Sequence, residues 1–140
     1  MIAAYTIAAL LLLGINDDLP VCNSEAADQG IQMEMNICAQ RDFLIADAQL
    51  NAQWAITSDR MKTRDARWEA DEYAYRDDRP GYFETLLEAQ RAWLSYRDAH
   101  CRSEGYYARG GSLEPLLVLT CKSALTIART AELNALVEQN

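Results

Sequence analysis

The sequence contains little of what most catalytic and metal sites are built from. His100 is its only histidine, none of its four cysteines forms a CxxC pair, and no Gly-rich phosphate loop, GxSxG motif or HExxH motif occurs. Acidic residues are numerous, but sequence neighbours such as Asp71 and Glu72 do not face each other on a helix, so they make poor acid and base pairs. We therefore predict a protein that is not an enzyme and that needs neither a cofactor nor a metal.

Basic residues are scarce as well. The 140-residue chain has 13 lysines and arginines against 21 aspartates and glutamates, which gives a net charge of -8 at pH 7. A chain this acidic repels nucleic acid and anionic membrane surfaces, so we predict neither as a partner. A cationic partner is its natural complement. The length suits one domain, and half of the residues are apolar, which is enough to form a core.

The chain begins with 15 uncharged, mainly apolar residues, MIAAYTIAALLLLGI, and then turns polar at NDDLP. This run is too short to span a bilayer comfortably and is typical of the apolar part of a secretory signal. We predict that residues 1–21 are a signal peptide with a short lead. Residues 22–140 then form a single helical domain, periplasmic or secreted, with no membrane span after signal removal. The cleavage position, and whether the N-terminus stays as an anchor, are left open by the sequence.

Four cysteines in an exported chain indicate two disulfides, for which three pairings exist. On a helical projection Cys38 lies away from the main apolar stripe of its helix, whereas Cys101 and Cys121 each lie within theirs. These positions favour a bridge from Cys22 to Cys38 and a second bridge from Cys101 to Cys121. The first would hold the lead against one helix, and the second would join two consecutive helices.

Apolar periodicity predicts an all-α domain of three main helices, which form an antiparallel bundle stapled by the two disulfides. The first helix covers about residues 31–54, and the highly charged residues 59–78 either continue it or fray. The second helix covers about residues 82–104, and the third about residues 112–137. No strand-like alternation and no internal repeat occurs in the sequence.

Helix-breaking residues mark the boundaries between these helices. Pro80-Gly81 separates the first helix from the second, and Gly110-Gly111 marks a turn before the third. Ser112 is a suitable N-cap for the third helix. Pro115 then lies in the first turn, where its missing N–H is harmless.

Two charged residues fall on apolar helix faces. Asp47 lies within the apolar stripe of the first helix, and Arg97 lies in the middle of the apolar arc that includes Leu94 on the second. Long charged side chains are rarely buried unpaired, so we predict a buried ion pair between them, with Asn51 and Gln90 supplying further donors and acceptors. Its expected role is to fix helix register. The alternative, a catalytic cleft, needs a second titrating group on that face, and the sequence shows none.

Three blocks of the sequence occur in an order that resembles a known family. They are MNICAQRDFLIADAQLN at residues 35–51, AQRAWLSYRDAHC at residues 89–101 and TCKSALTIARTAEL at residues 120–133. Together they resemble the LprI-like family, a group of exported bacterial domains named after a lysozyme inhibitor. The resemblance covers roughly residues 22–133. The positions that match the first two blocks are Ala46, Asp47, Leu50, Asn51, Gln90, Trp93, Leu94, Tyr96, Arg97, Asp98 and Cys101.

The resemblance implies an all-helical, disulfide-bearing periplasmic or surface domain without a known cofactor, and it implies that some members inhibit lysozyme. The net charge fits a cationic lysozyme as partner, because opposite fields speed association. Acidic and aromatic residues gather after the first helix, a mixture that interfaces favour, although a solvated helix extension has the same composition. The predicted partner surface consists of Asp65, Trp68, Glu69, Asp71, Glu72, Tyr73, Tyr75, Asp77 and Asp78.

A second hypothesis is an accessory protein that binds another envelope protein or a second copy of itself. Ile45 and Ile56 form a second apolar arc on the first helix. This arc would either serve as a dimer face or pack beneath the lead that Cys22 holds. The sequence alone does not choose between an unknown envelope partner and lysozyme.

Overall fold

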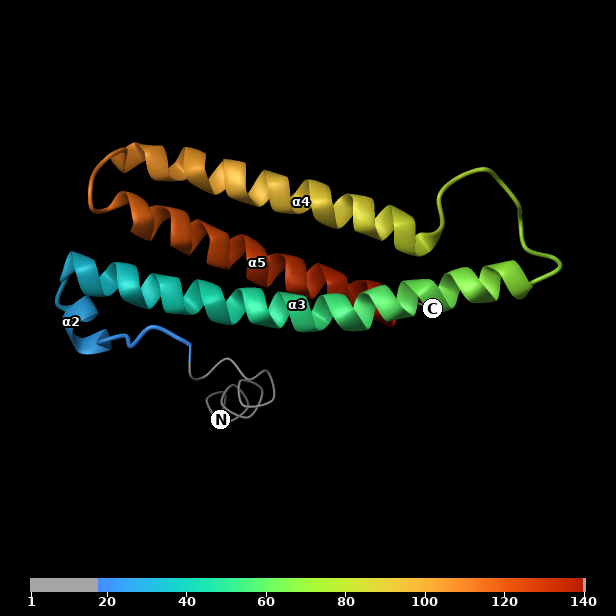
Figure 1. Cartoon of the computed structure of the whole chain (residues 1–140), viewed down its shortest axis with the longest axis horizontal. Helices are drawn as coiled ribbons and strands as arrows, with labels where there is room; N and C mark the ends of the chain where they lie inside the picture. Colours follow the sequence, from blue (N-terminus) through green and yellow to red (C-terminus); the bar gives the residue numbers. More distant parts are fainter. Residues whose placement is uncertain (1–17, 140) are drawn as a thin grey trace.

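The computed structural model describes residues 18–139 and shows an all-α fold, which confirms the predicted fold class (Figure 1). A short helix, α2 (Ser24–Asp28), precedes the long helix α3 (Gln32–Ala70). Helix α4 (Tyr82–Gly105) returns antiparallel to α3, and α5 (Glu114–Glu138) runs antiparallel to α4. Residues 1–17, which include the apolar run and the main part of the predicted signal peptide, lie outside the described residues.

Helix α3 resolves the alternative that the sequence left open. It continues for 39 residues through most of the charged segment and ends at Ala70. Neither Gly nor Pro interrupts this stretch, and Asp71 ends it with an extended backbone. The Asp71 carboxylate accepts a hydrogen bond from the backbone N–H of Tyr73 at 2.9 Å, which starts a turn instead of another helical turn. The charged segment is therefore helical in its first half and a loop in its second.

The connection from α4 to α5 is short and contains the 3-10 turn η1 (Tyr106–Ala108). Gly110 has a positive φ of 79°, a conformation that favours glycine. The prediction that Ser112 is the N-cap of α5 was wrong: the cap position is Leu113, without a side-chain cap bond. Glu114 instead turns back and accepts a hydrogen bond from the Gly110 N–H at 2.6 Å. Pro115 lies in the first turn of α5, as predicted.

The core lies where all three long helices meet. Helix α5 packs against both α3 and α4, so it supplies the third side of the bundle. Leu94 was predicted to face this core but is 37% exposed, because α4 turns only part of its apolar arc inward. The buried cluster consists of Leu50, Met61, Leu86 and Leu133, with Trp54, Phe83, Trp93 and Leu136 packed around it.

Both predicted disulfides are confirmed, and both lie at the same end of the bundle (Figure 1). Cys22–Cys38 joins the lead to the start of α3 with a Cα–Cα distance of 4.9 Å. Cys101–Cys121 joins the end of α4 to the start of α5 at 5.4 Å. We call this end the stapled end. The opposite end, where the loop Asp71–Gly81 connects α3 to α4, is the open end.

None of the helices in residues 18–139 is both long and apolar enough to cross a bilayer.

Candidate partner-binding site at the open end

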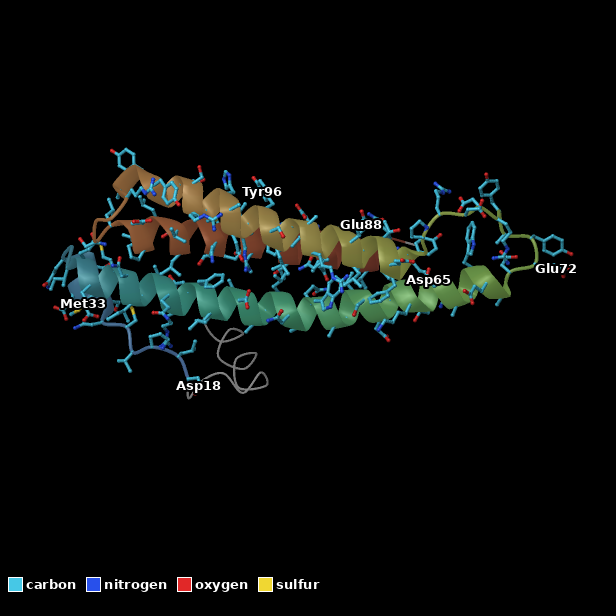
Figure 2. The ribbon with its side chains drawn as sticks, turned by 45° about the horizontal axis from the view of Figure 1, so that its top comes forward. Asp18, Met33, Asp65, Glu72, Glu88 and Tyr96 are labelled. Carbon is cyan, nitrogen blue, oxygen red and sulfur yellow. A yellow bond between two sulfur atoms is a disulfide. The ribbon has the colours of Figure 1, made fainter. Side chains whose placement is uncertain are left out.

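The loop Asp71–Gly81 projects from the open end of the bundle (Figure 1). It carries exposed aromatic and acidic side chains. Tyr73 is 91% exposed and Tyr75 is 70% exposed, which is unusual for side chains of this size. The loop contains four carboxylates and two arginines. Figure 2 shows Glu72 at its outer tip. The loop therefore presents aromatic rings and negative charge on a convex part of the surface.

Arg76 holds the loop to the end of α3. Its Nη2 donates hydrogen bonds to the backbone carbonyls of Glu69 at 3.2 Å and Asp71 at 2.9 Å. Its guanidinium also lies 6.0 Å from the centre of the Trp68 ring, within the range of a cation–π contact. These contacts restrain the base of the loop. They leave the rings of Tyr73 and Tyr75 free to contact a partner.

One loop carboxylate is already paired. Asp77 accepts a hydrogen bond from the backbone N–H of Arg79 at 3.0 Å and forms an ion pair with its guanidinium. The hydrogen bond from the Arg79 side chain lowers the pKa of Asp77 below its ordinary value. Asp77 therefore stays ionised, but Arg79 offsets its charge. Asp71, Glu72 and Asp78 contribute the remaining negative charge of the loop.

Asp65 has a structural role that the sequence did not reveal. Its carboxylate accepts hydrogen bonds from the backbone N–H groups of Tyr82 at 2.6 Å and Phe83 at 3.0 Å, so it caps the N-terminus of α4 from a neighbouring helix. A Cβ at Gly81 would lie 2.6 Å from this carboxylate, so the close approach needs glycine there. Asp65 belongs to the predicted partner surface, but its oxygens are occupied within the chain.

An open groove of about 1150 Å³ lies beside the loop, between the end of α3 and the start of α4. Trp68 and Tyr82 meet edge to face in its wall, with ring centroids 6.3 Å apart. A smaller hollow of about 450 Å³ adjoins it and is lined by three arginines of α3: Arg60, Arg64 and Arg67. The open end thus has an acidic, aromatic tip and a basic flank.

Arg64, one of the three arginines of the basic flank, binds the end of α5. Its Nη2 donates hydrogen bonds to the carbonyls of Leu136, at 3.1 Å, and Gln139. The last carbonyls of a helix have no partner within the helix and carry partial negative charge. Arg64 therefore caps the C-terminus of α5. In addition to the apolar core, hydrogen bonds of Asp65 and Arg64 link the three helices at the open end, where no disulfide lies.

Arg97 and Asp47 meet in the middle of the bundle. Arg97 Nη1 lies 3.1 Å from Asp47 Oδ1 and 3.3 Å from Thr126 Oγ1. The Arg97 side chain is buried, whereas the Asp47 side chain is 36% exposed, so only one partner is removed from water. Asn51 donates to Asp47 at 3.4 Å. Gln90 does not join this group, because its carbonyl oxygen accepts a hydrogen bond from Arg129 Nε at 3.0 Å.

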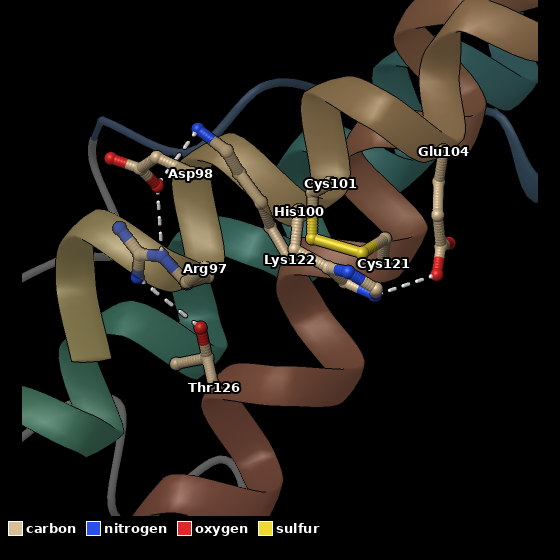
Figure 3. The surroundings of a disulfide bond; sticks show 8 residues. All are labelled: Arg97, Asp98, His100, Cys101, Glu104, Cys121, Lys122 and Thr126. Atoms are coloured by element: carbon tan, nitrogen blue, oxygen red, sulfur yellow. Dashed lines mark hydrogen bonds and ion pairs between the residues drawn. A yellow bond between two sulfur atoms is a disulfide. The ribbon is translucent and has the colours of Figure 1, made fainter. Parts of the chain in front are cut away.

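Asp98 extends this group toward the stapled end (Figure 3). Arg97 Nε lies 3.0 Å from Asp98 Oδ1, and Lys122 Nζ lies 3.3 Å from the same oxygen. Partial burial acts to raise the pKa of Asp98, but the hydrogen bond and positive charge of Arg97, with a contribution from Lys122, lower it overall. The Arg97 guanidinium also lies 5.3 Å from the centre of the Phe43 ring and 5.2 Å from that of Trp93. Arg97 is therefore paired with two carboxylates and is not a free cation.

Among residues 18–139, one group has side chains placed as metal ligands could be, formed by His100, Glu104 and Cys121. The Cys121 sulfur is bonded to Cys101, so the oxidised chain offers only an imidazole and a carboxylate there. Two ligands are fewer than a structural zinc site uses.

Comparison with known proteins supports the family resemblance carried by the three sequence blocks. The model of the family described as "Lysozyme inhibitor LprI" matches residues 22–133. A protein of Rhizobium meliloti (strain 1021), described as uncharacterized, is 45% identical over 107 residues, which cover 76% of this chain and 74% of that protein. No solved structure matches the chain. The resemblance seen in the sequence is thus confirmed, and the chain belongs to the LprI lysozyme inhibitor family, a family of inhibitors and not of enzymes.

Proposed function

We propose that this chain is an exported inhibitor that binds a cationic lysozyme through the loop Asp71–Gly81 at its open end. The family supplies the class of activity. The observation that carries the choice of surface is the pair of strongly exposed rings, Tyr73 and Tyr75, on a loop whose base is anchored. Aromatic side chains supply much of the binding energy at protein interfaces. Each ring buries a large apolar area, while only a few side-chain torsions lose their freedom.

Charge supports the same surface. Between Asp65 and Glu84 the sequence has seven carboxylates against three arginines. Opposite fields raise the association rate of two proteins, and salt screens this effect. Because Arg76 already restrains the loop, little of the binding energy is needed to order its backbone.

Export is part of the proposal. Two disulfides with no free cysteine among the described residues are typical of proteins that fold in oxidising compartments. The uncharged run at the beginning of the sequence supplies a signal of the secretory type. A periplasmic or surface location would also place the chain where it could meet a lysozyme.

The test is titration of the oxidised, purified protein into a lysozyme assay that follows lysis of bacterial cells. The double variant Tyr73→Ala/Tyr75→Ala is compared with Tyr107→Ala, which removes an equally exposed ring (89%) at the stapled end. We expect the double variant to need at least about tenfold more protein for half-inhibition, since removing an interface residue that contributes strongly costs more than about 1 kcal/mol. Tyr107→Ala should behave like the parent.

Moderate salt should weaken inhibition by the parent protein, because the attraction is largely between exposed charges. Equal inhibition by the parent and the double variant would show that the contact surface lies elsewhere. If excess parent protein leaves lysis unchanged, the lysozyme proposal fails. The alternative of an accessory protein with another envelope partner would then be tested by pull-down.

A further inference from the structure

The basic flank of the open end is a strongly charged feature that the proposed function leaves unused. Its three arginines, Arg60, Arg64 and Arg67, are spaced by four and three residues on α3, so their side chains share one face of the helix. The hollow that they line has a volume of about 450 Å³. A water molecule takes up about 30 Å³ in the liquid, so the hollow has room for a small molecule. The other residues that line it are Trp68, Asp71, Tyr82 and Gln139.

Two of these arginines have no polar partner among residues 18–139. Neither Arg60 nor Arg67 forms an ion pair or a side-chain hydrogen bond there, and the Arg60 Nε is shielded from solvent without a hydrogen-bond acceptor. By contrast, Arg97 and Arg129 each contact a carboxylate of the chain. A buried donor without an acceptor destabilises the fold, and like charges one turn apart on a helix repel each other. An anion in the hollow would relieve both effects.

Arg64 gives the hollow a positive charge that is held in place. Its Nη2 donates hydrogen bonds to the carbonyls of Leu136 and Gln139, so the end of α5 orients the guanidinium. The same contacts meet the partial negative charge at the C-terminus of that helix. Arg60 and Arg67 make no such contact with α5, and their charges remain available to a ligand.

The lining favours an anion with more than one negative charge. Three arginines and the Asp71 carboxylate give it a net charge of +2, three positive charges less one negative. The fork of a guanidinium group matches both phosphate and carboxylate oxygens. A phosphate monoester carries a charge of about −1.5 to −2 at pH 7 and has three acceptor oxygens, whereas a carboxylate carries a single charge. The monoester therefore matches the charge and the donors of the hollow better.

The wall of the hollow suits an organic group attached to that phosphate. Trp68 and Tyr82 meet there edge to face, and Tyr82 is 44% exposed, so part of its ring is open to a ligand. We infer that the hollow binds a small, soluble phosphate monoester, with Arg60 and Arg67 donating hydrogen bonds to the phosphate. The net charge of -8 repels anionic membrane surfaces, which favours a soluble molecule over a lipid headgroup as the source of the phosphate.

The first experiment is isothermal titration calorimetry of the oxidised protein at low salt in a buffer without phosphate. The probes are phenyl phosphate and benzoate, which share an aromatic ring but differ in charge and in the number of acceptor oxygens. We expect phenyl phosphate to bind saturably and at least about tenfold more tightly than benzoate. Equal affinities would contradict the preference for phosphate. Absence of saturable binding of phenyl phosphate at millimolar concentrations would overturn the inference.

Variants of the arginines locate the binding. Arg60→Gln and Arg67→Gln should each weaken binding of phenyl phosphate at least about tenfold, a loss of about 1.4 kcal/mol. Arg67 is exposed, so its substitution tests the site without disturbing the core. Arg102→Gln, at an exposed position of α4, removes the same charge and is the matched control, which should bind like the parent. Equal affinity of Arg67→Gln and Arg102→Gln would show that the hollow is not the site.

Sedimentation with vesicles of phosphatidylcholine and phosphatidic acid distinguishes the two sources of phosphate. We expect the parent protein to stay in the supernatant, as the soluble source requires. Sedimentation of the parent but not of Arg67→Gln would assign the phosphate to a lipid headgroup and overturn the soluble source. None of these measurements involves lysozyme, so failure here and failure of the proposed function remain distinguishable.

Discussion

The two ends of this bundle are held together by different means. At the stapled end, two disulfides join the lead to α3 and α4 to α5, and the chain passes from α4 to α5 through a short turn. At the open end the helices are joined by the Asp65 cap on α4, the Arg64 contacts to α5 and the anchored loop Asp71–Gly81. Covalent links at one end therefore allow the other end to present a long loop without loss of the bundle.

Removal of Cys101–Cys121 should have the largest effect on stability. The bridge spans 20 residues, and a loop of this length stabilises a fold by about 3 kcal/mol in the chain-entropy model. Cys101→Ser/Cys121→Ser should lower the free energy of unfolding by about this amount in urea titrations followed by circular dichroism. Cys22→Ser/Cys38→Ser should lower the free energy of unfolding by less than about half this amount, because α2 has no buried residue and can detach locally. Equal losses would show that the lead is part of the cooperative core.

The second-largest loss of stability is expected from a substitution in the middle of the bundle. Arg97→Met keeps an apolar stem against Phe43 and Trp93 but removes the hydrogen bonds to Asp47, Asp98 and Thr126. We expect a loss of about 2 kcal/mol, since hydrogen bonds to charged groups contribute about 1.5 to 3 kcal/mol while relief of desolvation offsets part of it. The melting temperature should fall by roughly 6 to 10 °C.

Two further variants sharpen this prediction. Asp47→Asn should cost less than Arg97→Met, because water already solvates part of the Asp47 carboxylate. Arg91→Met, at an exposed position of the same helix, should change stability by no more than about 0.5 kcal/mol. An unchanged melting temperature in both Arg97→Met and Asp47→Asn would mean that the ion pair adds no net stability.

At the open end, Asp65→Ala should have a smaller effect on stability than on inhibition. Loss of a helix N-cap typically costs about 1 kcal/mol, and here it also frees the start of α4 and the loop before it. We expect weaker inhibition in the lysis assay, since the loop becomes more mobile. Asp59→Ala, an exposed position of α3, is the control for removing one negative charge. If both variants inhibit equally, the cap does not position the contact surface.

The smallest effect should be seen in the pH dependence. Because the pKa of Asp98 is lowered in the folded state, its carboxylate stabilises the fold above its unfolded pKa of about 3.9, and this stabilisation is lost as the pH falls through the folded value. Between about pH 5 and pH 3, the melting temperature of Asp98→Asn should therefore fall less than that of the parent. Asp42→Asn, an exposed position, should follow the parent curve. A parallel acid response of Asp98→Asn and the parent would contradict the lowered pKa.

Much of this fold follows from local features of the sequence. The helix positions follow apolar periodicity, and the disulfides follow the angular positions of Cys38, Cys101 and Cys121 on those helices. The pairing of Arg97 with Asp47 was predicted for the same reason, since both fall on apolar arcs. Gln90 was assigned to the wrong partner, because a projection of one helix does not show which residue of α5 faces it.

The structure of the open end was less accessible to sequence reasoning. Asp65 caps a helix that begins 17 residues later, and a capping pattern is read from sequence only when cap and helix are adjacent. The end of α3 at Ala70 depends on a turn made by Asp71 and on the anchoring of Arg76, neither of which alters apolar periodicity. Ser112 matched the residue preference for an N-cap, but the turn placed Leu113 at that position.

The order in which the cysteines pair has a consequence for how the oxidised protein is made. The first cysteine joins the second, and the third joins the fourth, so neither loop encloses a cysteine of the other pair. A chain that enters an oxidising compartment amino-terminus first brings Cys22 and Cys38 together before Cys101 arrives. Each thiol then meets its native partner first, across a short loop that closes readily. Such a chain can reach its native connectivity without disulfide reshuffling, which is a slow process.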